Sequence, residues 1–284
     1  MKMYFWLVTT DHLSDRLWFR DEEDFKMAMN IVAILAATLN VRIISFVLMS
    51  NHVHFVLECE EGDAWLFITK LKKRYSQYYW RKYGAKSFLE GNGIDIRPVS
   101  FDDESLERAI AYVQMNPVAA NICLNPEGYP WGSGNAFFNQ SPRKGVPFGS
   151  VSGREAERII HCREKLPQDY LISDLGYIDA ASYVQIGLVE SLFRTPARMN
   201  YFLRSSSKAK RLNEGVSFTD QIISGAVKNL IATLFHMDSF PELVEVQQAE
   251  TVRQIKYRFS CDPAQMARVL GISYDEVCRL LELM

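Results

Sequence analysis

VRIISFVLMSNHVHFVLEC, residues 41–59, is the stretch that decides the fold. Residues 41–49 are almost continuously apolar and rich in branched side chains, as expected of a strand that is buried on both faces. Ser50 and Asn51 provide a tight connection, and residues 52–59 return to the same composition. The stretch therefore predicts a β-hairpin inside a sheet.

The segments around this hairpin predict the rest of an α+β domain. Two flanking segments are aromatic or alternating, and three others have apolar residues at three- and four-residue steps. Pro98 cannot donate a backbone hydrogen bond, so its strand belongs at an edge of the sheet. The resulting order, β-α-β-β-α-β-α, is that of a ferredoxin-like split βαβ sheet with one added helix. The predicted strands are 3–9 and 94–101, and the predicted helices are 21–40, 63–83 and 102–116.

The length of 284 residues predicts two domains. Residues 125–153 are rich in Gly, Pro, Asn and Ser, which places the expected boundary near residue 150. We expect the sheet domain over 1–150 and a mostly α-helical domain over 151–284.

The last segment of the chain has the spacing of a helix-turn-helix over 262–284. Ala267 is small enough to let two helices approach, and Gly271 provides the turn between them. Asp275 and Glu276 would oppose tight binding in a major groove because they repel phosphate. A structural helical hairpin and a reader of double-stranded DNA both remain open.

The composition excludes several classes of protein. Hydrophobic residues make up 48% and charged residues 23%, which is typical of a globular chain and not of a disordered one. Five scattered cysteines without a C-x-x-C pair indicate neither a disulfide framework nor a zinc finger. The apolar start of the chain is shorter than the ~20 residues of a membrane span and has no cleavage site, so we expect a cytoplasmic protein without a membrane partner. The net charge of −2 means that any nucleic-acid site depends on local clustering.

A pair of histidines is the first candidate for chemistry. His52 and His54 are two residues apart in a predicted strand, so both side chains project from the same face. Two adjacent imidazoles can hold one divalent ion, although each could also be an ordinary hydrogen-bonded residue of the sheet. A third histidine of an H-x-H-x-H motif would fall at Val56, which excludes that motif.

A tyrosine on the predicted helix 102–116 is the second candidate. Tyr112 and Asn116 are one helical turn apart, at the border of the apolar stripe of this helix. A border position anchors the ring and leaves the hydroxyl accessible. The same position also suits a tyrosine that only packs its ring and hydrates its tip.

Residues 70–86 carry seven Lys and Arg residues and no Asp or Glu. Aromatic residues alternate with these cations, so one helix face could neutralise phosphates and stack unpaired bases. A solvated helix face with core aromatics is the alternative. The residues predicted to contact DNA are Lys70, Lys72, Lys73, Arg74, Tyr78, Arg81 and Lys82.

Four motifs together resemble a known family. FVLMSNHVHFVLE (46–58), LKKRYSQYYWRKY (71–83), AYVQMNPVAA (111–120) and the YPW tripeptide at 129–131 resemble the single-tyrosine HUH transposases of the IS200-like family. The REP-associated tyrosine transposases are the most similar branch. The resemblance covers residues 1 to about 140, and the combination of the histidine pair with Y-x-x-x-N-P is far more specific than either part.

The resemblance implies a metal-dependent endonuclease and strand transferase that acts on single-stranded DNA through a 5′-phosphotyrosine. By position in the motifs, Tyr112 matches the nucleophile, and His52, His54 and Asn116 match the metal-binding residues, with Mg²⁺ or Mn²⁺ as the cofactor. The partner it implies is a hairpin-forming single strand. Related small transposases are often homodimers, whereas the REP-associated branch need not be, so both states remain open. A transposase-derived DNA-binding protein that no longer cleaves is the alternative, and a replication initiator or relaxase would share the chemistry on another substrate.

Overall fold

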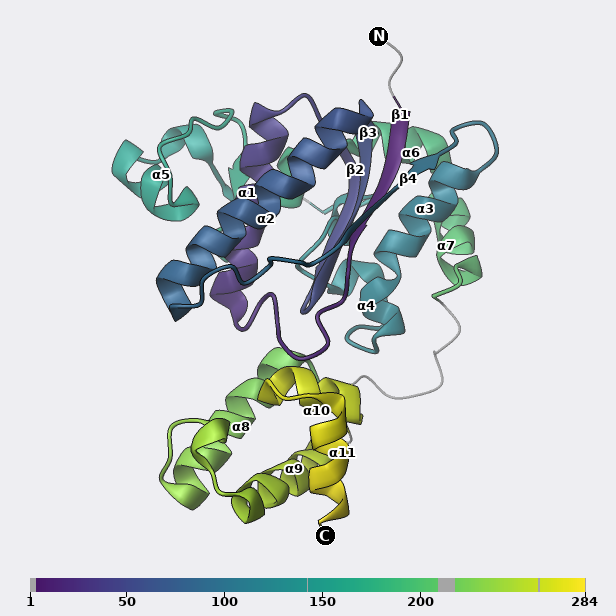
Figure 1. The fold of residues 1–284 in the computed structure, drawn as a ribbon. Helices are drawn as coiled ribbons and strands as arrows, with labels where there is room; N and C mark the ends of the chain where they lie inside the picture. The colour runs from purple at the N-terminus through teal and green to yellow at the C-terminus, as the bar shows by residue number, and fades with distance from the viewer. Residues whose placement is uncertain (1–3, 142, 209–217, 260, 284) are drawn as a thin grey trace.

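The structure is a computed structural model that describes residues 4–141, 143–208, 218–259 and 261–283. Its centre is an antiparallel sheet with the strand order β2-β3-β1-β4 (Figure 1). The mixed α/β class is thus confirmed, with the hairpin in the sheet and the strand that contains Pro98 at an edge. The strands are β1 (Tyr4–Thr10), β2 (Arg42–Met49), β3 (His52–Cys59) and β4 (Ile94–Val99).

Helices cover both faces of this sheet. On one face lie α1 (Glu22–Thr38) and α2 (Glu61–Tyr83), and Phe55 of β3 meets Phe67 of α2 with 5.1 Å between ring centroids. On the other face lies α3 (Ser105–Gln114). Successive side chains of a strand point to opposite faces of the sheet. His54 therefore faces α3, while Phe55 faces α2.

The helix predicted over 102–116 is shorter than expected. Glu104 has a left-handed backbone with φ 62°, and the Asp103 carboxylate accepts a hydrogen bond from the backbone N–H of Ser105 at 3.1 Å. These residues form a turn that ends before the helix begins, so α3 starts at Ser105. After Met115 the chain continues as the short helix α4 (Asn116–Ala119), because Pro117 fits the first turn of a new helix.

The hydrophobic core of the sheet does not end near residue 150. Asn30 of α1 donates to the carbonyl of Ile159 at 2.8 Å and accepts from the N–H of Ile178 at 2.9 Å, so later segments pack on the same core. They are β5 (Val146–Pro147), α5 (Gly153–Ile160), β6 (Leu171–Ile172), α6 (Ile186–Phe193), α7 (Pro196–Ser205) and the 3₁₀ helices Pro126–Gly128, Gly134–Ala136, Phe148–Ser150 and Ala180–Ser182.

A second hydrophobic cluster begins at Ile223. Within the described residues the core therefore divides between Leu203 and Ile223, and the predicted boundary at 150 does not coincide with this division. The Gly- and Pro-rich segment, on which the predicted boundary was based, packs against the sheet. The N–H of Ser133 in this segment bonds to the carbonyl of Phe46 in β2 at 3.0 Å. The second cluster contains α8 (Asp220–Phe235), the 3₁₀ helix Phe240–Glu242, α9 (Glu245–Phe259), α10 (Pro263–Leu270) and α11 (Tyr274–Glu282).

The segment predicted as a helix-turn-helix forms α10 and α11. Gly271 joins them with a left-handed backbone at φ 71°, and Ala267 is buried between helices. Ser273 begins α11 by accepting a hydrogen bond from the N–H of Glu276. Among the described helices, none has the length and apolar character needed to cross a membrane.

Gly132 tests how tightly the 129–133 segment packs on the hairpin. A Cβ at this position would lie 2.8 Å from the carbonyl oxygen of Phe46, which is backbone and cannot move aside. We expect Gly132→Ala to lower the free energy of unfolding by about 1–3 kcal/mol. Thermal or chemical denaturation of the full chain measures this loss.

Gly187 is the matched control, because a Cβ there meets no described atom within 4 Å and the residue lies in α6. Gly187→Ala should leave stability unchanged or raise it by up to about 1 kcal/mol. Equal effects of the two substitutions would contradict the packing argument.

Candidate metal and tyrosine centre

The two predicted histidines lie together at the end of β3 that adjoins the β2–β3 turn. Their ring centroids are 4.7 Å apart at an angle of 89°, and only 5% of His52 and 2% of His54 is exposed. Among the described residues, Nε2 of His52 and both ring nitrogens of His54 lack a hydrogen-bond partner. Buried polar atoms are normally paired, so these nitrogens are available to a ligand.

Asn51 determines which nitrogen of His52 is free. Its Nδ2 donates to the carbonyl of Leu13 at 2.8 Å, so its Oδ1 is left to accept from Nδ1 of His52, also at 2.8 Å. Nδ1 of His52 must then carry the proton, and Nε2 keeps its lone pair. A hydrogen bond of this kind, to the ring nitrogen that does not bind the metal, typically orients a metal-binding imidazole.

Burial keeps both imidazoles neutral. It lowers the pKa of His54 to about 3, and the positive charge of Lys208 contributes to the shift. Burial, followed by the neighbouring His54 and His12, lowers the pKa of His52 well below its ordinary value. Neutral imidazoles retain the lone pairs that coordinate a metal ion, so these residues fit a divalent cation.

Tyr112 and Asn116 lie beside the histidines. The ring of Tyr112 meets that of His54 edge-on, with 5.6 Å between centroids. Nδ2 of Asn116 donates to the carbonyls of Tyr112 at 2.9 Å and of Val113 at 3.3 Å, which leaves its Oδ1 as the atom for another partner. The polar side chain of Asn116 makes a smaller contribution that opposes the lowering of the His54 pKa. The four predicted site residues are therefore brought together.

Burial raises the pKa of Tyr112, and the positive charge of Arg97 only partly opposes the shift. The hydroxyl is consequently protonated at neutral pH. A reaction at its oxygen needs a nearby group that removes the proton or stabilises the phenolate.

A third histidine completes the cluster. His12 follows β1, and its ring stacks on that of His52 with 3.6 Å between centroids. One ring nitrogen from each of His12, His52 and His54 lies within 4.8 Å of the others. The sequence analysis missed His12 because it is far from the H-x-H motif along the chain. The signal that could have found it is the pairing of β1 with β3, in which Thr9 faces His54.

The centre opens into a cleft of about 610 Å³ between the sheet and the second hydrophobic cluster. Figure 1 shows α10 beneath the end of the sheet where this cleft lies. Lys208 extends its ammonium to 5.1 Å from the centroid of the Tyr112 ring, and Arg268 of α10 bonds to Asp220. The lining includes His12, His52, Asn116, Lys208, Asp220, Gln265 and Arg268.

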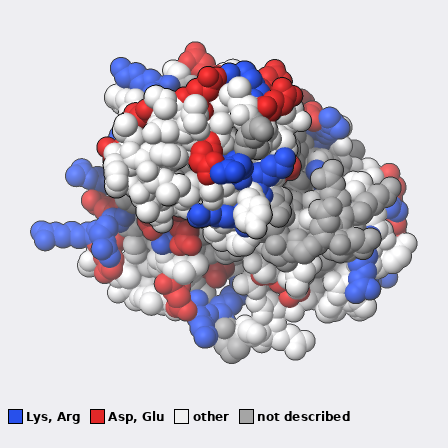
Figure 2. Space-filling model, turned by 90° about the horizontal axis from the view of Figure 1, so that it is seen from below, with Lys and Arg blue, Asp and Glu red and all other residues white. Residues whose placement is uncertain are grey.

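The cations of this cleft are a local feature. On the face seen in Figure 2, Lys and Arg side chains are interspersed with Asp and Glu. Among the described residues, Lys208 and Arg268 are the Lys and Arg side chains that line the cleft and can attract an anionic ligand.

The predicted DNA-contact helix α2 lies on the opposite face of the sheet from Tyr112. Four of its seven predicted residues bind partners in the chain itself. Lys82 pairs with Asp24 at 2.8 Å, and the hydroxyl of Tyr78 donates to the same carboxylate at 2.9 Å. Lys72 donates to the carbonyl of Asn92, and Arg74 pairs with Glu164.

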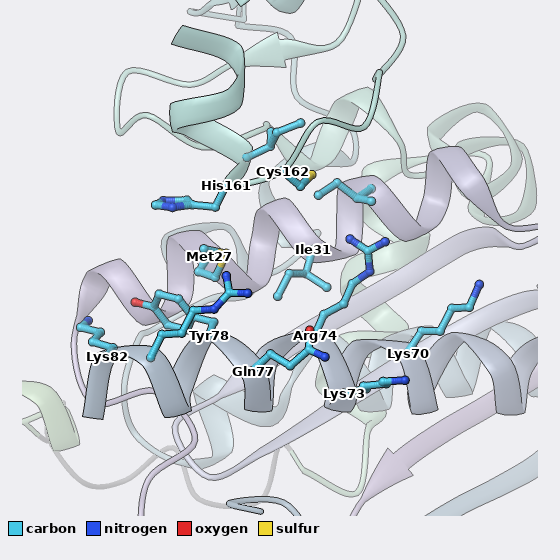
Figure 3. Close-up of a pocket in the computed structure, with 13 residues that line it drawn as sticks. Met27, Ile31, Lys70, Lys73, Arg74, Gln77, Tyr78, Lys82, His161 and Cys162 are labelled. Carbon is cyan, nitrogen blue, oxygen red and sulfur yellow. The ribbon is translucent and has the colours of Figure 1, made fainter. Parts of the chain in front are cut away.

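A groove of about 660 Å³ runs between α2, α1 and the end of α5 (Figure 3). Lys70 and Arg74 extend from α2 into it, and His161 and Cys162 form the opposite wall. Within the described ranges, Lys70, Lys73 and Arg81 make no ion pair, so their charges remain for an external anion. The floor is apolar and consists of Met27, Ile31 and Ile34.

Residues 10–93 match the family model described as transposase IS200 like. The match confirms the family resemblance over the segment that contains His12, His52 and His54. Among solved structures, the chain is similar to a REP-associated tyrosine transposase bound to a REP hairpin, at 14% identity and a TM-score of 0.38. That similarity covers 47% of this chain and 78% of the other. No curated protein matches the chain.

The groove on α2 makes the DNA-contact prediction testable without disturbing the fold. Lys70→Glu combined with Lys73→Glu should weaken binding of single-stranded DNA and flatten its salt dependence, because fewer counterions are then released. A fluorescence titration at several salt concentrations measures both effects.

Lys228→Glu combined with Lys256→Glu is the control. These residues are exposed on α8 and α9, and the change in net charge is the same. If both pairs weaken binding equally, the effect is one of net charge and α2 is not a specific contact.

Proposed function

We propose that this chain is a metal-dependent transposase that cleaves and rejoins single-stranded DNA through a 5′-phosphotyrosine, at ends that form hairpins. The IS200-like match over residues 10–93 supports the transposase class. The observation that carries the mechanism is the contact of Tyr112 with His54, beside a second buried imidazole and the Asn116 side chain. In this proposal the sheet is the ferredoxin-like HUH nuclease domain.

The metal would be held by His52, His54 and Asn116. When bound, a divalent ion such as Mg²⁺ or Mn²⁺ polarises the scissile phosphate and offsets the charge that develops on it. The buried, unpartnered nitrogens of the two histidines support this assignment. Asn51 supplies the hydrogen bond that holds the His52 ring in the orientation needed for ligation.

Tyr112 provides the nucleophile. Its phenolic oxygen gives its proton to water and forms a bond to phosphorus, while the bond from phosphorus to the 3′-oxygen of the preceding nucleotide breaks. The departing 3′-oxygen takes up a proton and becomes a free 3′-hydroxyl. Lys208, close to the Tyr112 ring, is placed to stabilise negative charge on the phenolate and on the phosphate.

The covalent intermediate also accounts for rejoining. The phosphodiester energy is conserved in the phosphotyrosine bond, so the 3′-hydroxyl of a different strand can attack the same phosphorus and release Tyr112. Cleavage and ligation are thus the two directions of one reaction, and no nucleotide triphosphate is consumed.

The remaining parts of the proposal concern the DNA partner. A single strand would enter the cleft at Tyr112, and the cationic groove on α2 would bind another part of the folded DNA. We further propose that α10 and α11 contact a double-stranded segment, and that two copies of the chain form a homodimer on paired ends.

Tyr112→Phe tests the nucleophile. The wild-type chain should form a covalent adduct with a labelled hairpin oligonucleotide in Mg²⁺ or Mn²⁺, visible on a denaturing gel. Tyr112→Phe should abolish the adduct completely while changing DNA affinity by less than about threefold, because only the hydroxyl is removed.

Tyr257→Phe is the control, since Tyr257 is 88% exposed on α9 and is not among the residues that line the cleft. An adduct that persists in Tyr112→Phe would assign the nucleophile to another residue. Tight binding by the wild type without any adduct would favour the alternative, a transposase-derived protein that binds DNA but does not cleave it.

Lys208→Gln tests the contact of the cleft with phosphate. We expect slower adduct formation and weaker binding, with the slope of log affinity against log salt reduced by about 0.7, the value for one phosphate on a single strand. Lys208→Arg keeps the charge and should restore the slope. An unchanged slope in Lys208→Gln would exclude a direct phosphate contact.

A further inference from the structure

Three imidazoles, and not two, meet at the proposed metal site. We propose that His12 is a ligand of the same ion as His52 and His54, which makes a three-imidazole centre that binds Co²⁺ and Zn²⁺ more tightly than Mg²⁺. This inference rests on the metal site of the proposed function and specifies its ligands and its selectivity.

The distances support a shared ion. The ligand nitrogens of the three histidines lie within 4.8 Å of one another. Nitrogens that share an ion with bonds of about 2.1 Å lie roughly 3.0–3.4 Å apart. The rings of His12 and His52 are stacked, so the His12 ring must turn before the lone pairs of both rings point at one ion. His12 is the exposed member of the three and is the ring with room to turn.

The backbone around His12 is fixed on both sides. The N–H of Asp11 bonds to the carbonyl of Gly93 at 3.1 Å, and the Asp11 carboxylate accepts from the N–H of Gly93 at 3.0 Å. On the other side, Leu13 and Asn51 exchange two hydrogen bonds, one of 3.0 Å to the Asn51 carbonyl and one of 2.8 Å from its side chain. His12 is therefore held at the centre, and ligation requires only rotation of its side chain.

Asn51 contacts both the segment that contains His12 and the side chain of His52. The same side chain that bonds to Leu13 also accepts from Nδ1 of His52. One asparagine thus sets the position of the His12 backbone and the tautomer of His52. A stacked pair of histidines on an ordinary surface would not require such a shared support.

The donor set determines which ions are preferred. Mg²⁺ favours oxygen ligands in octahedral geometry and retains water, whereas imidazoles favour the later first-row ions. Three imidazoles with the single amide oxygen of Asn116 form a nitrogen-rich set without a carboxylate. The occupied site would keep the full charge of the ion, which suits a phosphate ligand.

Titration of the full-length chain with Co²⁺ tests the proposal independently of DNA cleavage. The visible absorption of bound Co²⁺ reports its coordination, and competition with Mg²⁺ and Zn²⁺ gives relative affinities. His12→Ala should weaken Co²⁺ binding about tenfold or more and change the Co²⁺ spectrum, with Mg²⁺ affinity nearly unchanged. His236→Asn, at an exposed left-handed position of the second cluster, should behave as the wild type.

His12→Cys adds a positive signal. A thiolate at this position should retain Co²⁺ and produce a sulfur-to-metal charge-transfer band in the near ultraviolet. Unchanged Co²⁺ affinity and spectrum in His12→Ala, or a His12→Cys variant without the band, would overturn the proposal. Loss of Co²⁺ in His52→Ala but not in His12→Ala would leave a two-histidine site and refute only His12. Normal three-histidine binding without any DNA adduct would refute cleavage and leave the metal centre intact.

Discussion

The positions of the histidines depend on the two-residue turn at Ser50 and Asn51 and on the hydrogen bonds that this turn makes. The Ser50 carbonyl accepts from the N–H groups of Trp18 and Phe19, which holds the β1–α1 connection against the end of the hairpin. Asn51 binds Leu13 and orients His52. The Ser50 hydroxyl donates to Asp220 at 2.6 Å, which attaches the second hydrophobic cluster. A turn of two residues allows little backbone movement. The positions of the histidines, the β1–α1 connection and α8 therefore depend on one another.

The sequence predicts what depends on local periodicity. The hairpin over 41–59 and the shared face of His52 and His54 follow from composition and alternation alone, and both are found. His12 was missed because its place depends on the register of β1 against β3, a long-range pairing without a local signal. The hydrophobic core continues past the boundary predicted near residue 150, because the segment rich in Gly and Pro packs against the sheet. Gly132 is instead needed where the chain crosses the backbone of Phe46.

Cationic side chains lie in two separate places on the structure, the groove along α2 and the cleft beside α10. The cations of α2 were predicted as a single DNA-contact stripe, but Lys82 and Arg74 neutralise carboxylates of α1 and of the segment after α5. Because these cations pair with carboxylates of the same chain, a protein with a net charge of −2 can contain so basic a segment. Among the described residues of the groove, Lys70, Lys73 and Arg81 make no ion pair, while Lys208 and Arg268 line the cleft at the end of the sheet.

The ion pair of Arg268 with Asp220 makes the second cluster part of the cleft. Asp220 is 5% exposed and accepts from Ser50, Gln265 and Arg268, so its charge is balanced by α10 and its position by the hairpin turn. A ligand that binds Arg268 in the cleft must share this cation with Asp220 or displace it. Binding in the cleft is therefore coupled to the docking of α10 against the sheet, because the same side chain contributes to both. The helical cluster is in this way a wall of the cleft that His52 and Asn116 line, and its docking contributes to the shape of this cleft.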